Sequence, residues 1–301
     1  YDTECTPGRK GSWRLTPAHS TQGFYSDANI RHLVNFAAAR NIRIVPEISI
    51  PSHAGAAIHA YPHLGNPALV NEAPHGGNQT LWPSAASLSF VEAAFHHACS
   101  LFPSPTIHIG GASTDWGPWE SDLSLMRAGL TSGAAIERLF IDRALRTLHF
   151  HGRRAAAWDS LTRAYPTPPP GTTLLAHRPG NAGRRAAESS GAPWILADAD
   201  ILTLSHPGRT NSPLEPAHTL FDDLTQALRG ERLKGVEAVA WSASVTTPDL
   251  LFYHLLPRLL VVAEAAWHGE DSLPWDKLAP LVEQEMAHLR RTIPYWNPQR
   301  P

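Results

Sequence analysis

The segment Thr106 to Ser113 is where this sequence first suggests chemistry. It reads Thr-Ile-His-Ile-Gly-Gly-Ala-Ser. Apolar residues that run into a Gly-Gly pair predict a short buried strand that opens onto a loop, where the backbone approaches another group closely. Acid–base chemistry needs side chains that donate or hold a proton at such a loop. Ala112 and Ser113 stand there instead, and neither titrates near neutral pH.

The same loop continues into Asp115 and Trp116. A carboxylate at this position could enter the site as a substitute acid if the loop is shifted. The alternative is a solvated turn residue, which is the commoner role of Asp on a polar loop.

The 17 histidines raise the question of a metal site. The close pairs lack accompanying Cys or carboxylate ligands in a recognised spacing: His96-His97, His149-x-His151 and His59-x-x-x-His63. Scattered surface histidines explain them better. We therefore expect no metal and no cofactor.

The elements that must position these residues alternate between helix and strand. Ser26 caps a predicted helix whose apolar residues recur with helical spacing: Ile30, Leu33, Val34, Ala37 and Ala38. Further helices are predicted over residues 88–101, 136–148 and 248–267. Strands are predicted over residues 42–50, 106–111, 155–158, 174–177, 194–197 and 236–241. This βα alternation favours neighbouring parallel strands with helices outside.

Several of these segments resemble glycoside hydrolase family 20, the β-N-acetylhexosaminidases. Thr106 to Gly111 is similar to the family's His-Ile-Gly-Gly signature, which continues into an Asp-Glu pair. Residues 25–31 and 42–54 resemble the family's helix and its Pro-Glu-Ile-Asp-x-Pro-Gly-His-Ala segment. Ala157-Trp158-Asp159-Ser160 resembles the Trp-Asp-Glu motif, and residues 235–267 resemble the closing unit. The order and spacing fit the family over most of the chain.

The resemblance implies a site without its acids. In the family the substrate's acetamide oxygen attacks the anomeric carbon, the Asp orients the acetamide, and the Glu protonates the leaving oxygen. Ala112 and Ser113 occupy these two positions. The other acid and aromatic positions of the family site fall on small or neutral residues: Ser49, Ser160, Ala243 and the segment 202–205. The resemblance therefore implies that the scaffold was kept and hydrolysis was lost.

Some residues of the site type remain. Trp158 and Trp241 match positions at which the family stacks aromatic rings on the sugar, although ordinary barrel core is an equal alternative. His53 and His108 also match family positions, although a packed histidine is more often structural. With Trp116, these four residues are the candidate substrate-binding set, and the implied ligand is a glycan that contains N-acetylhexosamine.

The strand count predicts an incomplete barrel. An α/β fold of the (β/α)8 type has eight strands, and only six are predicted here. Residues 1–25 are predicted to be irregular and are too short for two βα units of roughly 30 residues each. We therefore expect a single domain over residues 1–301 that lacks the first two βα units. The family's first-strand Arg has no match.

An incomplete barrel leaves open strand edges, which soluble proteins cover. We expect a protein partner or a homo-oligomer beside residues 42–50 and 236–241. The formal net charge of −2 gives no reason to expect nucleic acid, and no apolar run is long enough to predict a membrane span. The start at Tyr1 suggests a processed or trimmed chain, and the resemblance slightly favours an extracellular or organellar lumen. Cys5 and Cys99 could form a disulfide or remain separate thiols.

Two functions follow. The first is a hexosaminidase homologue without hydrolysis, acting as a structural or assembly subunit or as a glycan-binding protein. The alternative is an active glycoside hydrolase that releases N-acetylhexosamine by substrate-assisted retaining catalysis with a non-family acid such as Asp115. The loss of several acids together favours the first.

Overall fold

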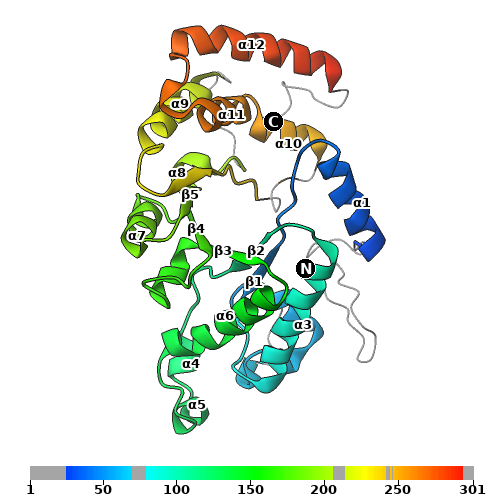
Figure 1. Cartoon of the computed structure of the whole chain (residues 1–301), viewed down its shortest axis with the longest axis vertical. Coiled ribbons are helices and arrows are strands. Elements are labelled where there is room, and N and C mark those ends of the chain that lie inside the picture. The colour runs from blue at the N-terminus through cyan, green and yellow to red at the C-terminus, as the bar shows by residue number, and fades with distance from the viewer. Residues whose placement is uncertain (1–24, 70–78, 206–213, 242–244, 246, 294–301) are drawn as a thin grey trace. The chain divides into compact units, whose positions relative to one another are not determined.

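The computed structural model describes residues 25–69, 79–205, 214–241, 245 and 247–293. The chain divides into two compact units, Tyr1–Thr173 and Leu174–Pro301. The described residues form six parallel strands that follow the order of the chain, with helices between them (Figure 1). The predicted α/β architecture with six parallel strands is therefore confirmed.

Unit 1 starts with α1 (Asp27–Ala38), and its cap is the predicted one. The Ser26 hydroxyl accepts a hydrogen bond from the Asn29 N–H, and the Asn29 side chain accepts from the Ser26 N–H. This capping box satisfies donors that a helix start leaves without partners. The predicted apolar face is only partly buried, because Ala37 is buried while Leu33 is exposed.

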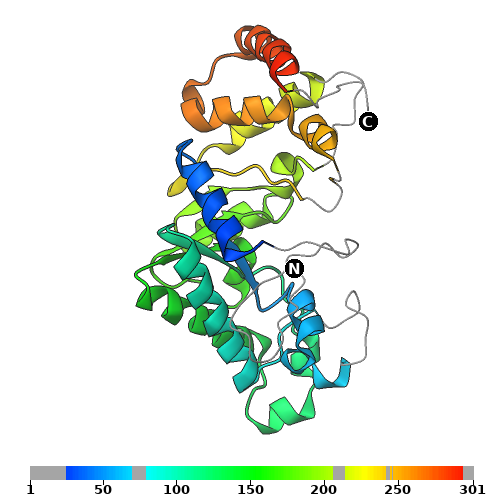
Figure 2. The same ribbon diagram turned by 90° about the vertical axis from the view of Figure 1, so that its right-hand side faces the viewer.

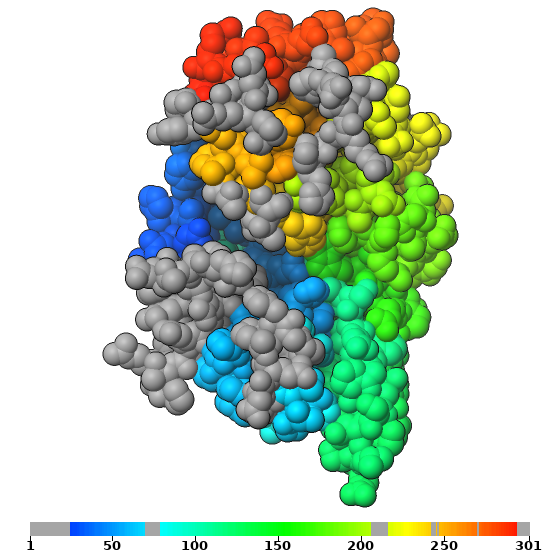
Figure 3. Space-filling model, turned by 180° about the vertical axis from the view of Figure 1, so that it is seen from behind, coloured from blue at the N-terminus to red at the C-terminus, as the bar shows by residue number. Residues whose placement is uncertain are grey.

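The remaining elements of unit 1 alternate as expected. In chain order they are β1 (Glu47–Ile50), α2 (Gly55–Ala60), η1 (Pro62–Leu64), η2 (Pro67–Leu69), α3 (Ala85–Leu101), β2 (Thr106–Gly110), α4 (Gly117–Glu120), α5 (Leu123–Arg127), α6 (Gly133–Phe150), β3 (Arg154–Trp158) and η3 (Asp159–Arg163). Helices α3 and α6 pack against each other (Figure 2). The segment of α4 and α5 stands out from unit 1 in the space-filling view (Figure 3).

The strands of unit 1 are held in a parallel register that brings their carboxyl ends together. Glu47 lies beside His108 and Ile50 beside Gly110, while His108 on its other side lies beside Ala156. Large apolar side chains from the strands and helices fill the core: Ile107, Ile109, Phe95, Phe140 and Trp119. The side chains that follow Ile50, Gly110 and Trp158 therefore share one edge of the sheet.

Unit 2 begins within β4 (Thr172–Ala176). It continues with α7 (Ala182–Ser190), β5 (Trp194–Leu196), α8 (Ala199–Leu202), α9 (Leu214–Ala227), β6 (Leu233–Val236), α10 (Pro248–Leu255), α11 (Arg258–His268), η5 (Gly269–Asp271) and α12 (Trp275–Thr292). Leu175 lies beside Ile195, and Leu196 beside Val236, in parallel pairs. A second apolar cluster joins the last helices: Ala217, Phe221, Val261, Leu278, Val282 and Met286.

The largest differences from the predicted boundaries occur at three elements. The first strand begins at Glu47 rather than residue 42, because Pro46 has no N–H for a sheet ladder. The last strand, β6, covers Leu233–Val236 and so shares only Val236 with the predicted range 236–241. Beyond it, Val239 forms an isolated bridge with Thr203. The predicted helix over 248–267 is two helices, α10 and α11, because Pro257 cannot continue the first.

Candidate functional site

The loop after β2 begins at two glycines with left-handed backbone. Gly110 has φ +78° and Gly111 has φ +68°. A Cβ atom at Gly110 would lie 2.7 Å from the Ile50 nitrogen and from the Ser49 Cα. Only glycine allows this approach between β1 and β2. The predicted close backbone contact is therefore present, and it fixes the position from which the loop continues into Ala112.

Two serine hydroxyls meet at the strand ends. Ser113 follows β2, Ser160 follows β3, and their Oγ atoms are 3.0 Å apart. Ser160 is buried and Ser113 is exposed. The Ser52 hydroxyl, from the segment after β1, lies 3.5 Å from the Ala112 carbonyl. These contacts at three successive strand ends are made by hydroxyls and a carbonyl, which do not titrate near pH 7.

Glu47 is the centre of a polar network beneath these hydroxyls. Its Oε1 accepts hydrogen bonds from the Trp158 indole Nε1 at 2.9 Å and from the Ser49 hydroxyl at 3.2 Å. The His108 Nδ1 lies 3.5 Å from the same oxygen. The rings of His108 and Trp158 meet edge to face with centroids 4.9 Å apart. The structure thus brings two predicted site residues, His108 and Trp158, onto one carboxylate that belongs to β1.

Burial keeps His108 neutral. The side chain is 5% exposed, and this loss of solvent lowers the pKa of His108 to about 4, although the nearby Glu47 charge raises it in part. Its Nδ1 accepts a hydrogen bond from the Gly110 N–H at 3.2 Å. A neutral histidine that supports the glycine turn is a structural residue near pH 7 and offers no proton.

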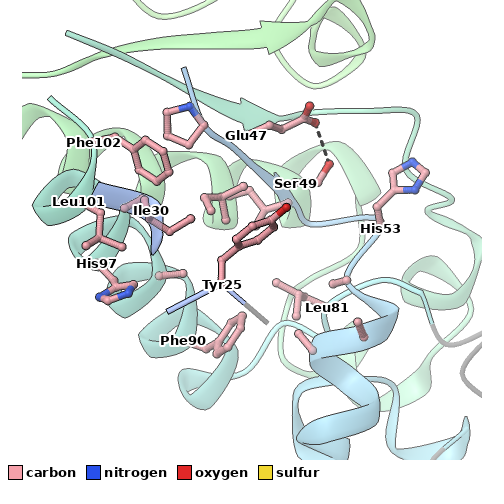
Figure 4. A pocket seen from close by; sticks show the side chains of 18 of the residues that line it. Tyr25, Ile30, Glu47, Ser49, His53, Leu81, Phe90, His97, Leu101 and Phe102 are labelled. Carbon is pink, nitrogen blue, oxygen red and sulfur yellow. Dashed lines mark hydrogen bonds between the residues drawn. The ribbon is translucent and has the colours of Figure 1, made fainter. Parts of the chain in front are cut away.

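His53 lies at the rim of a pocket of about 270 Å³ in unit 1. Figure 4 shows Glu47 and Ser49 on one side of this pocket and Tyr25 reaching into it. Apolar side chains from α1, β1 and α3 form most of the wall: Ile30, Ile48, Ala94, Ala98 and Leu101. His53 is exposed and has φ +59°.

Asp115 and Trp116 serve the start of α4. The exposed Asp115 carboxylate accepts a hydrogen bond from the Gly117 N–H at 3.0 Å, the pattern of a local turn. The indole Nε1 of Trp116 donates to Glu137 at 2.6 Å, and the Arg163 guanidinium lies 4.2 Å from the ring centroid. The indole N–H and a ring face of Trp116 are therefore occupied by protein groups.

Trp241 belongs to unit 2. It is 47% exposed, and its ring meets His177 edge to face with centroids 6.0 Å apart. Trp158, by contrast, is buried in unit 1. Ala243 lies outside the described residues.

Two residues that hold the loop after β2, Glu137 and Arg163, are not among those predicted from the sequence. The sequence does carry a signal for the first. The predicted helix over residues 136–148 has an acid on the face where apolar residues recur, and buried acids need partners. Arg163 has no comparable signal, because the Trp158-Asp159-Ser160 motif before it does not indicate which loop its side chain contacts.

The described residues contain no group of three or more His, Cys, Asp or Glu that could hold a metal ion. Among the described helices, none alone combines the length and apolar composition of a membrane span, while α10 and α11, bent by 50°, do so only when taken together. Cys99 is buried on α3. Cys5, with which it could form a disulfide, lies outside the described residues.

Comparison with known proteins gives consistent relatives. The chain is 27% identical to a β-hexosaminidase of Porphyromonas gingivalis, over 93% of this chain and 38% of the relative. It is 28% identical to a β-N-acetylhexosaminidase of Cellulomonas fimi, over 91% of this chain and 54% of the relative. The chain thus spans about half the length of the relatives it matches, or less.

Solved structures agree on the fold. A family 20 exo-β-N-acetylglucosaminidase from Vibrio harveyi, in complex with N-acetylglucosamine, superposes with a TM-score of 0.79 at 22% identity, covering 94% of this chain and 48% of that one. A family 20 β-N-acetylhexosaminidase from Streptomyces coelicolor gives a TM-score of 0.76 at 25% identity, covering 95% and 59%. The model of the family "Glycosyl hydrolase family 20, catalytic domain" matches residues 7–270 of this chain. The matched residues include the strand ends, the Gly-Gly turn and the Glu47–Trp158 contact. The chain therefore belongs to glycosyl hydrolase family 20.

Proposed function

We propose that this family 20 homologue has lost hydrolysis and acts as a glycan-binding protein or as a structural or assembly subunit. The observation that carries the proposal is the contact between the Ser113 and Ser160 hydroxyls at 3.0 Å. By the resemblance, both positions hold a glutamate in the family, and the preceding position, Ala112, holds an aspartate. General acid catalysis alone contributes about a hundred- to ten-thousand-fold in rate, so a hydroxyl in its place gives up most of the reaction.

Retained contacts favour binding over a purely inert fold. Glu47, Trp158 and His108 still form a connected network although the acids above it are absent. A Streptomyces plicatus β-hexosaminidase carrying an Asp-to-Ala mutation is described in complex with its product, N-acetylglucosamine. That protein holds the sugar with an alanine in place of one aspartate. By analogy, Ala112 is compatible with a bound N-acetylhexosamine.

The alternative is hydrolysis with Asp115 as the acid. The turn contact to the Gly117 N–H and the absence of a second acid next to Ser113 count against it, because the reaction needs both a proton donor and a charge at the acetamide. Asp115→Asn is the variant that separates the two functions.

The test is an assay with a chromogenic N-acetylglucosaminide between pH 4 and 8, together with calorimetric titration of N-acetylglucosamine. We expect no turnover above a buffer blank and measurable binding of the sugar. Glu47→Gln should weaken binding, because it removes the charge that accepts from Trp158 and Ser49. Turnover that Asp115→Asn abolishes would overturn the proposal in favour of the alternative. No turnover and no binding would leave the scaffold role.

A further inference from the structure

Glu137 is a carboxylate at a place where apolar side chains are the rule. It is 2% exposed and lies on α6 in line with the buried residues Ile141, Ala144 and Leu148. A buried carboxylate is costly unless hydrogen bonds replace its water, and burial raises the pKa of Glu137. A leucine here would complete the apolar face of the helix.

Both carboxylate oxygens of Glu137 accept hydrogen bonds from the loop between β2 and α4. The Thr114 hydroxyl donates to Oε1 at 3.3 Å, and the Trp116 indole donates to Oε2 at 2.6 Å. The Thr114 hydroxyl also donates to the Ala112 carbonyl at 3.2 Å, so its one proton is shared between this oxygen and Glu137 Oε1. The loop residues just after position 113 are thus fastened to α6 by their side chains.

The indole of Trp116 sits in a seat, which we define as Gly133 and Glu137 of α6 together with Arg163 of η3. A Cβ atom at Gly133, the first residue of α6, would lie 2.3 Å from the Cβ and Cγ of Trp116, so the ring lies directly on the helix backbone. Arg163 covers the ring, and its Nη1 donates to the Thr114 carbonyl at 2.9 Å. The Gly133 backbone, the Glu137 carboxylate and the Arg163 guanidinium therefore all contact the Trp116 side chain and hold it in place.

The seat connects the two loops that carry the paired serines. Arg163 ends η3, the short helix that follows β3 and contains Ser160. Thr114 is the residue after Ser113. Holding Thr114 between Glu137 and Arg163 therefore sets the distance between the loop after β2 and the loop after β3.

We propose that Glu137 is a positioning residue that holds the loop after β2 against α6 and thereby places residues 112 and 113 at the strand ends. It acts through Thr114 and Trp116 rather than by touching a ligand. The positioning itself is independent of the proposed function, and only its effect on sugar affinity rests on that function.

The test is hydrogen exchange of the amides in residues 112–117, measured beside thermal unfolding. Glu137→Leu should speed exchange in this loop about tenfold or more, the size expected for the loss of a hydrogen bond to a charged group. Its unfolding temperature should also fall, because the Trp116 indole N–H and the Thr114 hydroxyl lose their acceptor. A general packing role would instead speed exchange in β1, β2 and β3 as much as in the loop.

Two further variants address the seat without creating an apolar face. Glu137→Gln retains an oxygen that accepts from Trp116, so it should restore part of the protection. Gly133→Ala pushes the indole off the helix and leaves the carboxylate in place, and it should speed loop exchange as Glu137→Leu does. The matched control is Glu92→Gln, since Glu92 also meets α6 but pairs with Arg143, away from the loop; it should leave loop exchange unchanged.

Loop exchange that stays at the wild-type rate in both Glu137→Leu and Gly133→Ala would overturn the proposal, as would equal acceleration across β1, β2 and β3. Titration of N-acetylglucosamine adds an independent arm, in which Glu137→Leu should weaken binding about tenfold. Absence of binding in the wild type would refute the glycan-binding role alone, because the exchange measurement still decides the positioning role.

Discussion

The buried histidine at position 108 makes the fold sensitive to acid. Its pKa of about 4 in the folded protein lies below the usual value near 6.5. As pH falls from 6.5 to 4, the unfolded chain binds a proton that the folded protein refuses, so the free energy of unfolding decreases. The full loss is about 3 kcal/mol and is complete below pH 4.

We expect denaturant titrations at pH 7 and pH 4 to reveal this loss, and we expect His108→Asn to remove that part of the acid dependence. The variant also loses packing against Trp158, so the comparison concerns the difference between the two pH values within each protein. The same pH dependence in wild type and variant would contradict the assignment.

The two residues after the Gly-Gly turn, Ala112 and Ser113, give a second prediction at the scale of single side chains. Restoring the family's acids by Ala112→Asp with Ser113→Glu should not by itself give the activity of a relative such as the Cellulomonas fimi enzyme. We expect kcat/KM on a chromogenic N-acetylglucosaminide to stay below that enzyme's by about a hundredfold or more, since misplaced groups cost this much. Ser49, Ser160 and Ala243 remain neutral in this variant. The new glutamate at position 113 would lie beside the Ser160 hydroxyl, where the family has a second glutamate.

Adding Ser160→Glu to that double variant should raise the rate further if the missing acids act together. Full activity from the double variant alone would show that positions 112 and 113 are sufficient.

At the scale of elements, the contact between β1 and β2 depends on Gly110. Gly110→Ala should lower the free energy of unfolding by more than the roughly 1 to 2 kcal/mol that a left-handed backbone costs an L-residue, because its Cβ would also press on the backbone of Ile50 and Ser49. Gly129→Ala is a matched control, since Gly129 has φ +79° and open space around its Cβ position. Urea unfolding of both variants isolates the effect of close approach; equal losses would argue against it.

Local signals predicted these elements where the chain's own chemistry decides them. Capping, apolar runs and glycine predict the Ser26 cap, the strand that ends at Trp158 and, one residue too long, the strand that ends at Gly110. Tertiary contacts decided the rest. Leu33 belongs to the predicted apolar face of the first helix, yet it is exposed, because α1 buries little of that face. The hydrogen bonds from Trp116 and Thr114 to Glu137 join residues about 20 positions apart, and no periodicity reports such a pairing.

At the scale of the molecule, the stretch from Tyr25 to Val45 stands out for its exposed apolar side chains. Tyr25, Leu33, Phe36, Ile42 and Val45 are all exposed, and β1, which follows, is the first strand in the order. Exposed apolar residues gathered in one segment favour association. The partner or homo-oligomer expected from the sequence thus stays a prediction with a defined place to test it.

We expect light scattering at micromolar concentration to give a mass above the 32.8 kDa of one chain. Leu33→Ser with Phe36→Ser should reduce that mass, because both side chains lie on α1 and neither belongs to the core. Leu123→Ser on α5 is the control, as it removes an exposed leucine elsewhere. A monomer before and after substitution would refute self-association.

One domain over residues 1–301 stays a prediction. The contacts within the chain gather in two compact units, Tyr1–Thr173 and Leu174–Pro301. The candidate residues divide likewise, with Trp241 in unit 2 and His53, His108, Trp116 and Trp158 in unit 1. Composition and strand counting cannot detect such a division, because both units carry the same βα pattern.

The seat of Trp116 has a consequence for how this loop can evolve. Thr114, Trp116 and Glu137 carry the attachment, while the side chains of Ala112 and Ser113 take no part in it. Mutations at positions 112 and 113 therefore carry no folding penalty from the attachment and are open to selection or drift. A lineage can exchange acids for neutral residues there, or regain them, while inheriting the same loop unchanged.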